Sequence, residues 1–404
     1  MNSNDTVIVS ALRTPFSPFG GVLKEMHSSD LGALVIREVL ERVEVPGKIV
    51  DELYYGMCIQ SEAALESNVN ARQALLKAGM PEELISLTVD RACCSSLTCL
   101  QLGIRTIKAG DGEVILAVGA ENMSNTPLVM NGHRWGTGLR MPTFKDHLNP
   151  IYYSGHNPLA QDAGEVALEH GIDRQAQDEW ALRSQHRYQE AFRQGKFADE
   201  LVPVTIPRRK GEPIVFAADA FPKPDTSLEK LARLKTVYGS PTVTAGNAPG
   251  LDAGAAAILI MKRSRAEALG LEPQATIVTV QSVATKPRVM AEAPAYAINK
   301  ALGKANLDLA DIDLIEINEA FAAMPLVSTK ILAGDDEQRW NELQKITNVN
   351  GGAIAIGHPV GASGARIIMT LMYELRRRGG GLGAASICGG LAQADAAIIR
   401  VEKS

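Results

Sequence analysis

The sequence has little of what marks several protein classes. Its 404 residues include five cysteines, an odd number in a long chain, so we expect no disulfide framework and a reducing, cytoplasmic location. Cys93 and Cys94 are adjacent rather than spaced as zinc ligands, so no metal site is expected. The polar first residues lead directly into an apolar strand, and no long apolar run follows, which predicts neither a signal peptide nor a membrane span. The net charge of -5 does not indicate a nucleic-acid partner.

The chain alternates short apolar segments with helical patterns. With 46% hydrophobic and 22% charged residues, it can form two or three packed units with a large core. Helical spacing recurs at 97–107, and again at 367–375 before a basic turn and a glycine that end a helix. Strands are predicted at 6–11, 113–118, 255–261, 275–280, 313–317 and 384–387. Most are apolar on both faces, which predicts an α/β fold with helices covering the sheets.

One order of elements occurs twice, from residue 6 to 121 and from 275 to 402. The two stretches share little sequence, so we predict a structural duplication. Residues 122–247 between them are richer in Pro, His, Trp and Tyr and hold an amphipathic helix near 173–194. We therefore predict one half from 1–121 and 248–272 and the other from 273–404. The inserted 122–247 is either a ligand-binding loop domain or a plain structural insertion.

The segment 90–97 (DRACCSSL) places a cysteine between a predicted strand end near Val89 and a helix start near Ser95. At a helix N-terminus, unpaired N–H groups and the helix dipole favour thiolate over thiol. A thiolate is a nucleophile that attacks acyl carbonyls. The alternative is a buried inert cysteine, which is common, and this segment alone does not decide between the two.

The segment 348–366 (NVNGGAIAIGHPVGASGAR) is rich in glycine, which predicts tight turns and close backbone approach. His358 lies in its middle, before Pro359. A lone histidine is usually a structural residue. A histidine held on a rigid glycine turn before a helix is a good general base, and the density of glycine favours this second interpretation.

Two further strand ends carry polar or reactive side chains, and sites in open α/β sheets form beyond such ends. Cys388 in SICGG ends an apolar strand, and with a pKa near the working range it could act as acid or base, or be a core cysteine. Asn318 in INEAFA could donate a hydrogen bond to a developing oxyanion. Glu319 beside it could be a base or only a structural carboxylate.

Together these segments resemble the thiolase family over nearly the whole chain. The matching segments are 10–15 (SALRTP), 119–124 (GAENMS), 242–250 (TVTAGNAPG), 318–322 (NEAFA), 351–366 (GGAIAIGHPVGASGAR) and 388–390 (CGG). The segment around His358 is highly specific, and its order relative to NEAFA and the two cysteines matches the family. The resemblance implies a five-layer αβαβα core of two similar halves with an inserted loop domain. It also implies assembly as a homodimer or homotetramer.

The resemblance implies an acyltransferase of fatty acid metabolism, whose CoA and acyl-CoA are substrates and products and which needs no bound cofactor. The reaction is CoA-dependent cleavage of 3-ketoacyl-CoA or, in reverse, Claisen condensation of acyl-CoAs by ping-pong acyl transfer. Cys93 would carry the acyl group, His358 would accept its proton, and Cys388 would move the proton at the α-carbon. One oxyanion hole would be His358 with a water held by Asn318. The other would be the backbone N–H groups of Cys93 and Gly390.

The sequence departs from the family pattern at the nucleophile. The family turn reads cysteine, glycine, serine, glycine, leucine, whereas here Cys94 and Ser96 replace the glycines. Counting back from Leu97 identifies Cys93 as the nucleophile, with Cys94 facing elsewhere. We expect a stiffer turn and a smaller or more polar pocket. Leu391, in a shortened glycine run, is expected to reshape the site.

The resemblance also implies contacts with coenzyme A, some at changed residues. Leu159 stands where many thiolases have methionine, Pro249 stands in place of a serine, and Tyr238 stands where an aromatic packs near the adenine. The expected contacts are His156, Leu159, Leu234, Tyr238, Ala245, Pro249, Ala320 and Phe321. From these changes we hypothesise that the substrate is not plain acetoacetyl-CoA.

Two other functions share part of the pattern. A ketosynthase-like decarboxylating condensing enzyme pairs two histidines with its cysteine, and Asn318 stands here in place of one of them. A non-catalytic thiolase-fold subunit is expected to lack Cys93, His358 or Cys388, and all three are present. The thiolase interpretation is therefore favoured, in either the degradative or the biosynthetic direction.

Overall fold

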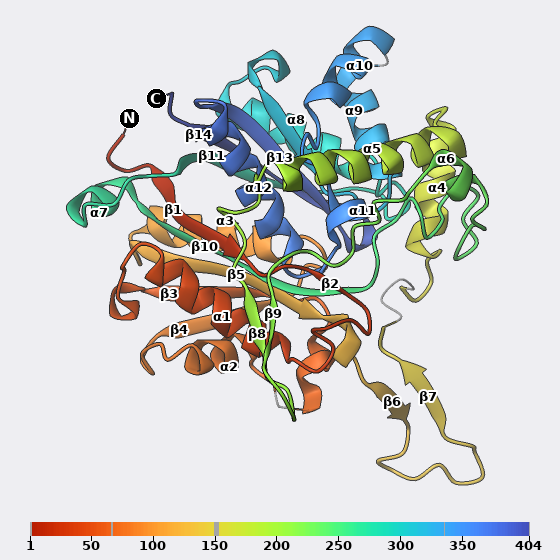
Figure 1. Cartoon of the computed structure of the whole chain (residues 1–404), viewed down its shortest axis with the longest axis horizontal. Helices are drawn as coiled ribbons and strands as arrows, with labels where there is room; N and C mark the ends of the chain where they lie inside the picture. Colours follow the sequence, from red (N-terminus) through yellow and green to blue (C-terminus); the bar gives the residue numbers. More distant parts are fainter. Residues whose placement is uncertain (1, 66–67, 149–152, 335, 404) are drawn as a thin grey trace.

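The computed structural model describes residues 2–65, 68–148, 153–334 and 336–403. Its centre is a mixed sheet of ten strands covered by helices (Figure 1). The strand order is β12-β13-β14-β11-β1-β10-β5-β3-β4, and β2 pairs with β10. The predicted α/β class is therefore confirmed.

The sheet consists of two half-sheets. The first contains β1 (Thr6–Arg13), β2 (Ser17–Pro18), β3 (Glu52–Gly56), β4 (Ile85–Val89), β5 (Val114–Asn122) and β10 (Asp252–Lys262). The second contains β11 (Ala275–Ala284), β12 (Leu314–Ile317), β13 (Gly381–Gly389) and β14 (Gln393–Val401). All six strands predicted from apolar runs are present, and several extend beyond the predicted ends because buried residues continue past the apolar run.

The two half-sheets share one topology. In each, the first strand pairs antiparallel with the last, as β1 with β10 and β11 with β14. The last strand pairs antiparallel with β5 or β13, which pairs parallel with β3 or β12. Beside β12, the counterpart of β4 is a single parallel bridge between Ile315 and Thr347. The predicted duplication is confirmed, and the halves join where Ile8 of β1 pairs with Ala275 of β11.

The helices form three layers around these half-sheets (Figure 1). One outer layer contains α1 (Ser28–Glu41) and α2 (Asn70–Lys77), and the other contains α8 (Ala293–Ala305), α9 (Ala323–Ala333) and α10 (Glu337–Ile346). The central layer contains α3 (Ser95–Ala109) and α12 (Ser363–Arg377), which contact both half-sheets. Shorter pieces are α7 (Arg263–Ala268), α11 (Ala353–Ile356) and the 3-10 turns η1 (Gly47–Ile49), η2 (Gln60–Leu65), η4 (Leu309–Asp311) and η5 (Gly390–Ala392). This is the five-layer αβαβα order that the resemblance implies.

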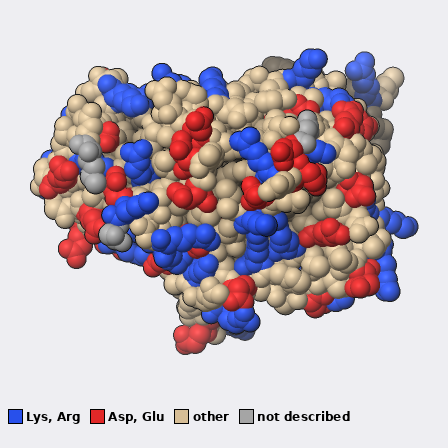
Figure 2. Space-filling model, turned by 90° about the horizontal axis from the view of Figure 1, so that it is seen from above, with Lys and Arg blue, Asp and Glu red and all other residues tan. Residues whose placement is uncertain are grey.

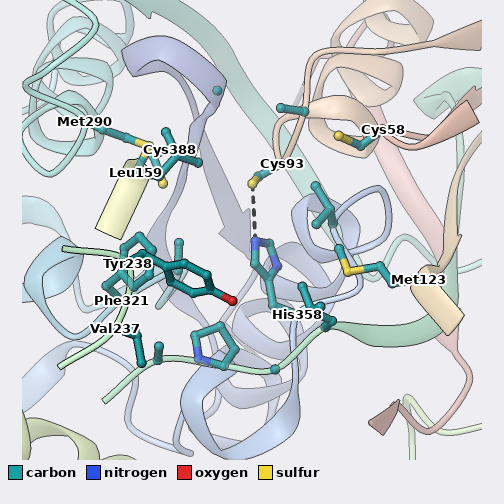
Figure 3. A pocket seen from close by; sticks show the side chains of 18 of the residues that line it. Cys58, Cys93, Met123, Leu159, Val237, Tyr238, Met290, Phe321, His358 and Cys388 are labelled. Atoms are coloured by element: carbon teal, nitrogen blue, oxygen red, sulfur yellow. Dashed lines mark hydrogen bonds between the residues drawn. The ribbon is translucent and has the colours of Figure 1, made fainter. Parts of the chain in front are cut away.

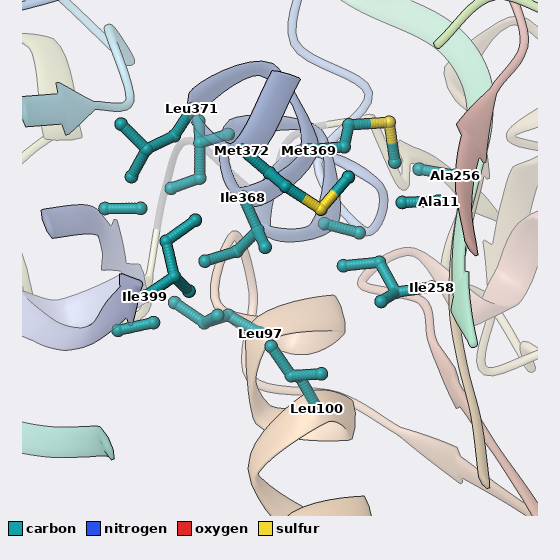
Figure 4. Close-up of a cluster of buried hydrophobic side chains, with 14 of the residues drawn as sticks. Ala11, Leu97, Leu100, Ala256, Ile258, Ile368, Met369, Leu371, Met372 and Ile399 are labelled. Carbon is teal, nitrogen blue, oxygen red and sulfur yellow. The ribbon is translucent and has the colours of Figure 1, made fainter. Parts of the chain in front are cut away.

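The central layer holds a buried apolar cluster (Figure 4). Its members include Leu97 and Leu100 of α3, Ile368, Met369, Leu371 and Met372 of α12, and Ala11, Ala256, Ile258 and Ile399 of the strands. The two helices approach closely at Gly364, where a Cβ would lie 2.8 Å from the backbone nitrogen of Leu97. Because α3 follows Cys93 and α12 follows His358, this packing brings the two turns together.

The segment after β5 adds its own small elements. They are η3 (Met123–Asn125), β6 (Leu128–Asn131), β7 (Thr143–Asp146), α4 (Leu159–Glu169), α5 (Arg174–Arg193), β8 (Val204–Ile206), β9 (Ile214–Phe216) and α6 (Leu228–Ala232). The strands pair only as β6 with β7 and β8 with β9, within the residues that the structure describes. Helix α5 confirms the predicted amphipathic helix, and the β6–β7 hairpin projects from the body (Figure 1).

A buried ion-pair cluster ties this segment to β1. Arg13 Nε donates to Glu200 Oε1 at 2.7 Å, and its Nη1 and Nη2 donate to the two carboxylate oxygens of Asp219 at 2.7 and 2.9 Å. Asp219 also accepts from the backbone N–H of Phe16 at 2.8 Å. Through Arg13, the SALRTP segment therefore connects the first strand to the insertion.

The surface carries charges of both signs. On the face shown in Figure 2, lysine and arginine side chains are interspersed with aspartate and glutamate. Among the described helices, none is both long and apolar enough to cross a membrane.

Candidate active site

Cys93 lies in the tight turn between β4 and α3. Ala92 before it adopts φ +50°, in the left-handed region that residues other than glycine rarely occupy. The backbone N–H of Arg91 donates to Ser95 Oγ at 2.9 Å, and that hydroxyl donates to Ala92 O at 2.6 Å. Arg91 also binds the buried Asp395 of β14 at 2.8 Å. The turn is thus held in place by its own side chains and by the second half.

His358 lies in the turn between α11 and α12. Gly357 before it has φ +109°, which requires glycine. The backbone N–H of His358 donates to Asp252 Oδ2 at 2.6 Å, and Nδ1 lies 2.6 Å from Ser363 Oγ. The Ser363 hydroxyl donates to Pro359 O at 2.9 Å, so it must accept from Nδ1–H. This tautomer leaves Nε2 with its lone pair free.

The imidazole connects Cys93 to a polar network behind it. Nε2 of His358 lies 3.3 Å from Cys93 Sγ (Figure 3) and 3.4 Å from Asn318 Nδ2. Asn318 Oδ1 accepts from Arg366 Nη2 at 3.3 Å, and Arg366 pairs with Glu316 at 3.4 Å. This orients the Asn318 amide with its nitrogen toward the imidazole. The arrangement suits proton transfer from the thiol to Nε2.

Both members of this pair are neutral at physiological pH. Burial raises the pKa of the Cys93 thiol well above its usual value, and nearby Cys388 raises it further. Burial lowers the pKa of His358 to about 3, with an added contribution from the charge of Arg366. The helix N-terminus was expected to lower the pKa of Cys93 and favour the thiolate. The pKa is instead raised, because desolvation outweighs the helix dipole, so this expectation is wrong.

Cys388 lies at the end of β13, across the same pocket from Cys93 (Figure 3). Burial raises its pKa to about 12, so the expectation of a pKa near the working range is wrong for the free protein. Gly390 follows in the same turn and also borders the pocket. A side chain at Gly390 would overlap the hydroxyl of Tyr153, so only glycine at this position leaves space for that hydroxyl.

The departures from the family turn lie outside the pocket. Cys94 is buried with its Sγ 3.4 Å from Ile387 O, and Ser96 Oγ accepts from the backbone N–H of Ala365 at 2.9 Å. Cys94 thus faces elsewhere, as predicted. Neither side chain lines the pocket, nor does Leu391, so the predictions of a smaller or more polar pocket and of a site reshaped by Leu391 find no support in direct contacts. Cys94 and Ser96 instead hold the nucleophile turn against β13 and α12.

Glu319 was predicted to be either a base or a structural carboxylate, and its contacts are those of a structural carboxylate. It accepts hydrogen bonds from Trp180 Nε1 at 2.9 Å, Ser184 Oγ at 2.8 Å, Asn348 Nδ2 at 2.9 Å and the backbone N–H of Ile354 at 3.1 Å. With all these donors it has no role as a base, and it holds α5 against the His358 segment.

The pocket has a volume of about 290 Å³ and is lined by most of the predicted site residues. Its lining includes Cys93, His358, Cys388 and Gly390, and also Leu159, Tyr238, Ala245, Pro249, Ala320 and Phe321. Asn318 is buried behind the imidazole. Leu234 lines an adjoining pocket that shares Ala245 and Ala248 with the first. His156 is exposed and lies outside both linings, so its contact with coenzyme A stays a prediction.

Several lining residues were missed by the sequence patterns. They are Cys58, Met123, Tyr153, Val237 and Met290, together with smaller neighbours. Cys58 follows the end of β3, so the strand-end rule applied above could have found it. Met123 follows the end of β5 in the same way. Tyr153, Val237 and Met290 come from turns and loops without periodicity, and only tertiary packing brings them to the pocket.

Comparisons with known proteins agree with this geometry. A family model described as "Thiolase, N-terminal domain" matches residues 6–264, and one described as "Thiolase, C-terminal domain" matches residues 271–401. An acetyl-CoA acetyltransferase of Cupriavidus necator is 42% identical over 95% of this chain and 96% of its own. A beta-ketoadipyl-CoA thiolase of Acinetobacter baylyi is 43% identical over 97% of this chain and 98% of its own.

Solved structures agree as well. A Bacillus anthracis acetyl-CoA acetyltransferase has a TM-score of 0.92 at 37% identity, covering 99% of both chains. Human mitochondrial 3-ketoacyl-CoA thiolase in complex with CoA has a TM-score of 0.91 at 36% identity, covering 99% of this chain and 98% of its own. Matches of this extent, in sequence and in fold, show that the protein belongs to the thiolase family.

Proposed function

We propose that this thiolase catalyses the reversible CoA-dependent cleavage of 3-ketoacyl-CoA with Cys93 as the acyl carrier. One observation carries the proposal: Cys93 Sγ lies 3.3 Å from an imidazole nitrogen whose tautomer leaves it free to accept a proton. Cys388 borders the same pocket and supplies the second proton-transfer group that the reaction needs. The reverse direction, condensation of two acyl-CoAs, uses the same groups.

Cleavage begins when His358 Nε2 takes the Cys93 proton and the sulfur attacks the C3 carbonyl. The C2–C3 bond breaks, the acyl group remains on Cys93 as a thioester, and the acetyl-CoA enolate takes a proton from Cys388. The thiol of an incoming CoA then gives its proton to the Cys388 thiolate and attacks the thioester. Cys93 leaves as thiolate and regains its proton from His358, so every group returns to its starting state.

Negative charge develops on a carbonyl oxygen in each half-reaction. We assign one oxygen to the backbone N–H groups of Cys93 and Gly390, which both border the pocket. The other is assigned to His358, protonated at Nε2 during the reaction, together with Asn318, which the Arg366 contact holds in place. A donor of this kind contributes about 3 kcal/mol to its transition state.

The arm of coenzyme A is assigned to the side of the pocket lined by Leu159, Tyr238 and Phe321 (Figure 3). These apolar side chains match the aliphatic and amide character of pantetheine. The adjoining pocket contains Leu234, Lys223, and Lys230 paired with Asp225 at 2.6 Å, and we assign the phosphates to the side of Lys223. A related structure that contains CoA supports this use of the fold.

The chain is assigned to a homo-oligomer, a dimer or a tetramer. Support comes from apolar side chains exposed on the projecting β6–β7 hairpin, such as Trp135 and Phe144, and on the edge strand β4, such as Ile85. Exposed apolar patches and open strand edges are common at subunit contacts. Light scattering during gel filtration tests the assignment, and a monomer at micromolar concentration would contradict it.

We also propose the division of the chain into halves 1–121 with 248–272 and 273–404, and a CoA-binding loop domain 122–247. The central sheet takes its described strands from the two halves, with only the last residue of β5 reaching into the loop domain, which supports this division. A cytoplasmic location is supported by the five free thiols, two of which would be lost to the reaction if oxidised.

The test is cleavage of a series of 3-ketoacyl-CoAs, from acetoacetyl to long and branched chains, with and without CoA. Cys93→Ala should abolish cleavage, whereas Cys99→Ala serves as the matched control because Cys99 is a buried cysteine of α3 outside the pocket. Cleavage of at least one substrate by the wild type and the control, but not by Cys93→Ala, is the expected result. Equal activity of all three proteins would rule out Cys93 as the acyl carrier.

A further inference from the structure

The pocket continues past the nucleophile to a second group of side chains. In Figure 3, Tyr238 and Phe321 lie on one side of the Cys93–His358 contact, and Cys58 and Met123 lie on the other. We call the part lined by Cys58 and Met123 the distal compartment. It belongs to the same continuous pocket, so one ligand can extend into both parts.

The reaction chemistry determines what enters the distal compartment. The C3 carbonyl of the substrate bonds to Cys93 Sγ, while C1 carries the CoA arm. Because the arm is assigned to the side of Tyr238 and Phe321, the carbons beyond C3 leave Cys93 in the opposite direction, toward Cys58 and Met123. The distal compartment therefore faces the acyl tail and not the leaving acetyl-CoA.

No side chain in the described part of the lining carries a positive charge that could neutralise a charge on that tail. Among the described residues that line the pocket there is no lysine or arginine. The only basic side chain in the lining is His358, which is neutral and is in contact with Cys93. The compartment itself presents a thiol and a thioether, which are apolar surfaces, and the lining beside it adds the uncharged hydroxyl of Tyr153.

The nearest charges behind the wall are acidic. Glu121 is fully buried, and its Oε2 accepts from the backbone N–H groups of Cys58 at 3.0 Å and Gly361 at 2.9 Å. Burial raises the pKa of the Cys58 thiol, with a further contribution from Glu121, and burial also raises the pKa of Glu121 to about 7, so this wall disfavours negative charge. A carboxylate in the compartment would be desolvated without a cationic partner in the described lining.

We propose that the distal compartment binds the acyl tail of the substrate and accepts a neutral aliphatic tail but rejects one that ends in a carboxylate. The inference rests on the proposed function and names its substrate class. It separates this chain from relatives named beta-ketoadipyl-CoA thiolase, although they are 43% identical to it.

The test compares 3-ketohexanoyl-CoA with 3-ketoadipyl-CoA, which have the same six-carbon chain and differ only in a terminal methyl or carboxylate. We expect kcat/KM for the neutral substrate to be at least about 100-fold higher, as an unpaired buried charge implies. An enzyme named beta-ketoadipyl-CoA thiolase serves as the positive control for the charged substrate. Acetoacetyl-CoA, which has no long tail, is measured alongside.

The outcomes are distinct. Equal or faster cleavage of 3-ketoadipyl-CoA overturns the inference and leaves the proposed function standing. Cleavage of acetoacetyl-CoA but of neither six-carbon substrate also overturns it, because no tail is then bound. Failure to cleave any of the three overturns the proposed function itself.

A variant pair tests the same point from the protein side. Met123→Lys places a cation in the distal compartment, and Met123→Gln is the neutral control of similar length. We expect the preference for the neutral substrate to fall by at least about 10-fold in the lysine variant relative to the glutamine variant. An unchanged preference in a folded lysine variant contradicts the inference, and if that variant fails to fold, the wild-type comparison decides.

Discussion

Ser363 determines which nitrogen of His358 can act as a base. Its hydroxyl proton goes to Pro359 O, so it accepts from Nδ1–H and leaves Nε2 facing Cys93. We predict that Ser363→Ala lowers kcat by about 10- to 100-fold, because the imidazole loses this preference for tautomer and orientation. Steady-state kinetics on a cleaved 3-ketoacyl-CoA measures the effect.

Ser96→Ala is the matched control for that prediction. Ser96 is also buried and also hydrogen-bonds to α12, through the backbone N–H of Ala365, but it does not touch His358. Both variants should lose about 1 kcal/mol of stability, and Ser363→Ala should lose at least about ten times more kcat than Ser96→Ala. Equal losses of kcat would mean that Ser363 acts only through packing.

Asp252 makes the stability of the fold depend on pH. Burial raises its pKa from 3.8 to about 7, so the folded protein binds this proton more tightly than the unfolded chain. The resulting stabilisation is present at low pH and is lost as the pH rises from about 4 to about 7. Asp252→Asn removes this loss and keeps an oxygen that can accept from the His358 N–H.

We therefore predict that Asp252→Asn gains roughly 2 kcal/mol of stability relative to the wild type between pH 5 and pH 8. Urea denaturation at the two pH values measures this. A difference between the proteins that does not change with pH would show that Asp252 titrates normally.

At the scale of elements, the sequence predicts what is local. Cys93, His358 and Cys388 could be predicted because each lies at a strand end or in a glycine turn. The predicted positions of the strands and helices agree with the structure. The conformation of these turns is a property of the adjoining residues, so the pattern is visible in the sequence. The alternatives for Glu319 were decided only by four donors that come from distant segments.

What depends on packing could not be predicted. Tyr153 and Val237 reach the pocket from irregular segments, and no periodicity marks them. The protonation of Cys93 and His358 was predicted in the wrong direction or not at all, because it depends on how far each side chain is removed from water. The roles of Cys94 and Ser96 likewise follow from the close packing of α3 against β13 and α12.

The close approach of α12 to α3 predicts opposite effects for two glycine substitutions. A Cβ at Gly364 would lie 2.8 Å from the Leu97 backbone, whereas at Gly303 in α8 nothing lies within 4 Å. Gly364→Ala should destabilise by about 1 to 3 kcal/mol through overpacking. Gly303→Ala should stabilise by roughly 0.5 to 1 kcal/mol, because alanine is the better helix former.

Thermal and urea denaturation of both glycine variants measure these effects. Activity of Gly364→Ala should fall as well, since Leu97 follows the nucleophile turn. If Gly364→Ala is as stable as the wild type, the two central helices do not pack as closely as described.

At the scale of the whole molecule, the site exists only where the two halves meet. Cys93 belongs to the first half, whereas His358 and Cys388 belong to the second. Asp252 of β10 reaches across to hold the backbone of His358, and Arg91 reaches across to Asp395 of β14. Each half therefore contributes some of the proposed catalytic side chains, and neither half contains all three.

Arg13 links the insertion to this core. Its guanidinium is fully buried and pairs with Glu200 and Asp219, both outside the first half. We predict that Arg13→Ala destabilises the protein by about 3 to 5 kcal/mol, because two buried carboxylates lose their partner. Urea denaturation measures the loss, and a change below about 1 kcal/mol would show that the cluster does not hold the insertion in place.

The most direct measurement is the position of the acyl group after the protein is mixed with an acyl-CoA in the absence of free CoA. Rapid quenching, digestion and mass spectrometry locate the thioester among the five cysteines. We predict that Cys93 alone carries the acyl group, that added CoA removes it, and that Cys93→Ala carries none. An acyl group on Cys94, Cys58 or Cys388 with Cys93 unmodified would contradict the assignment of the nucleophile and the mechanism built on it.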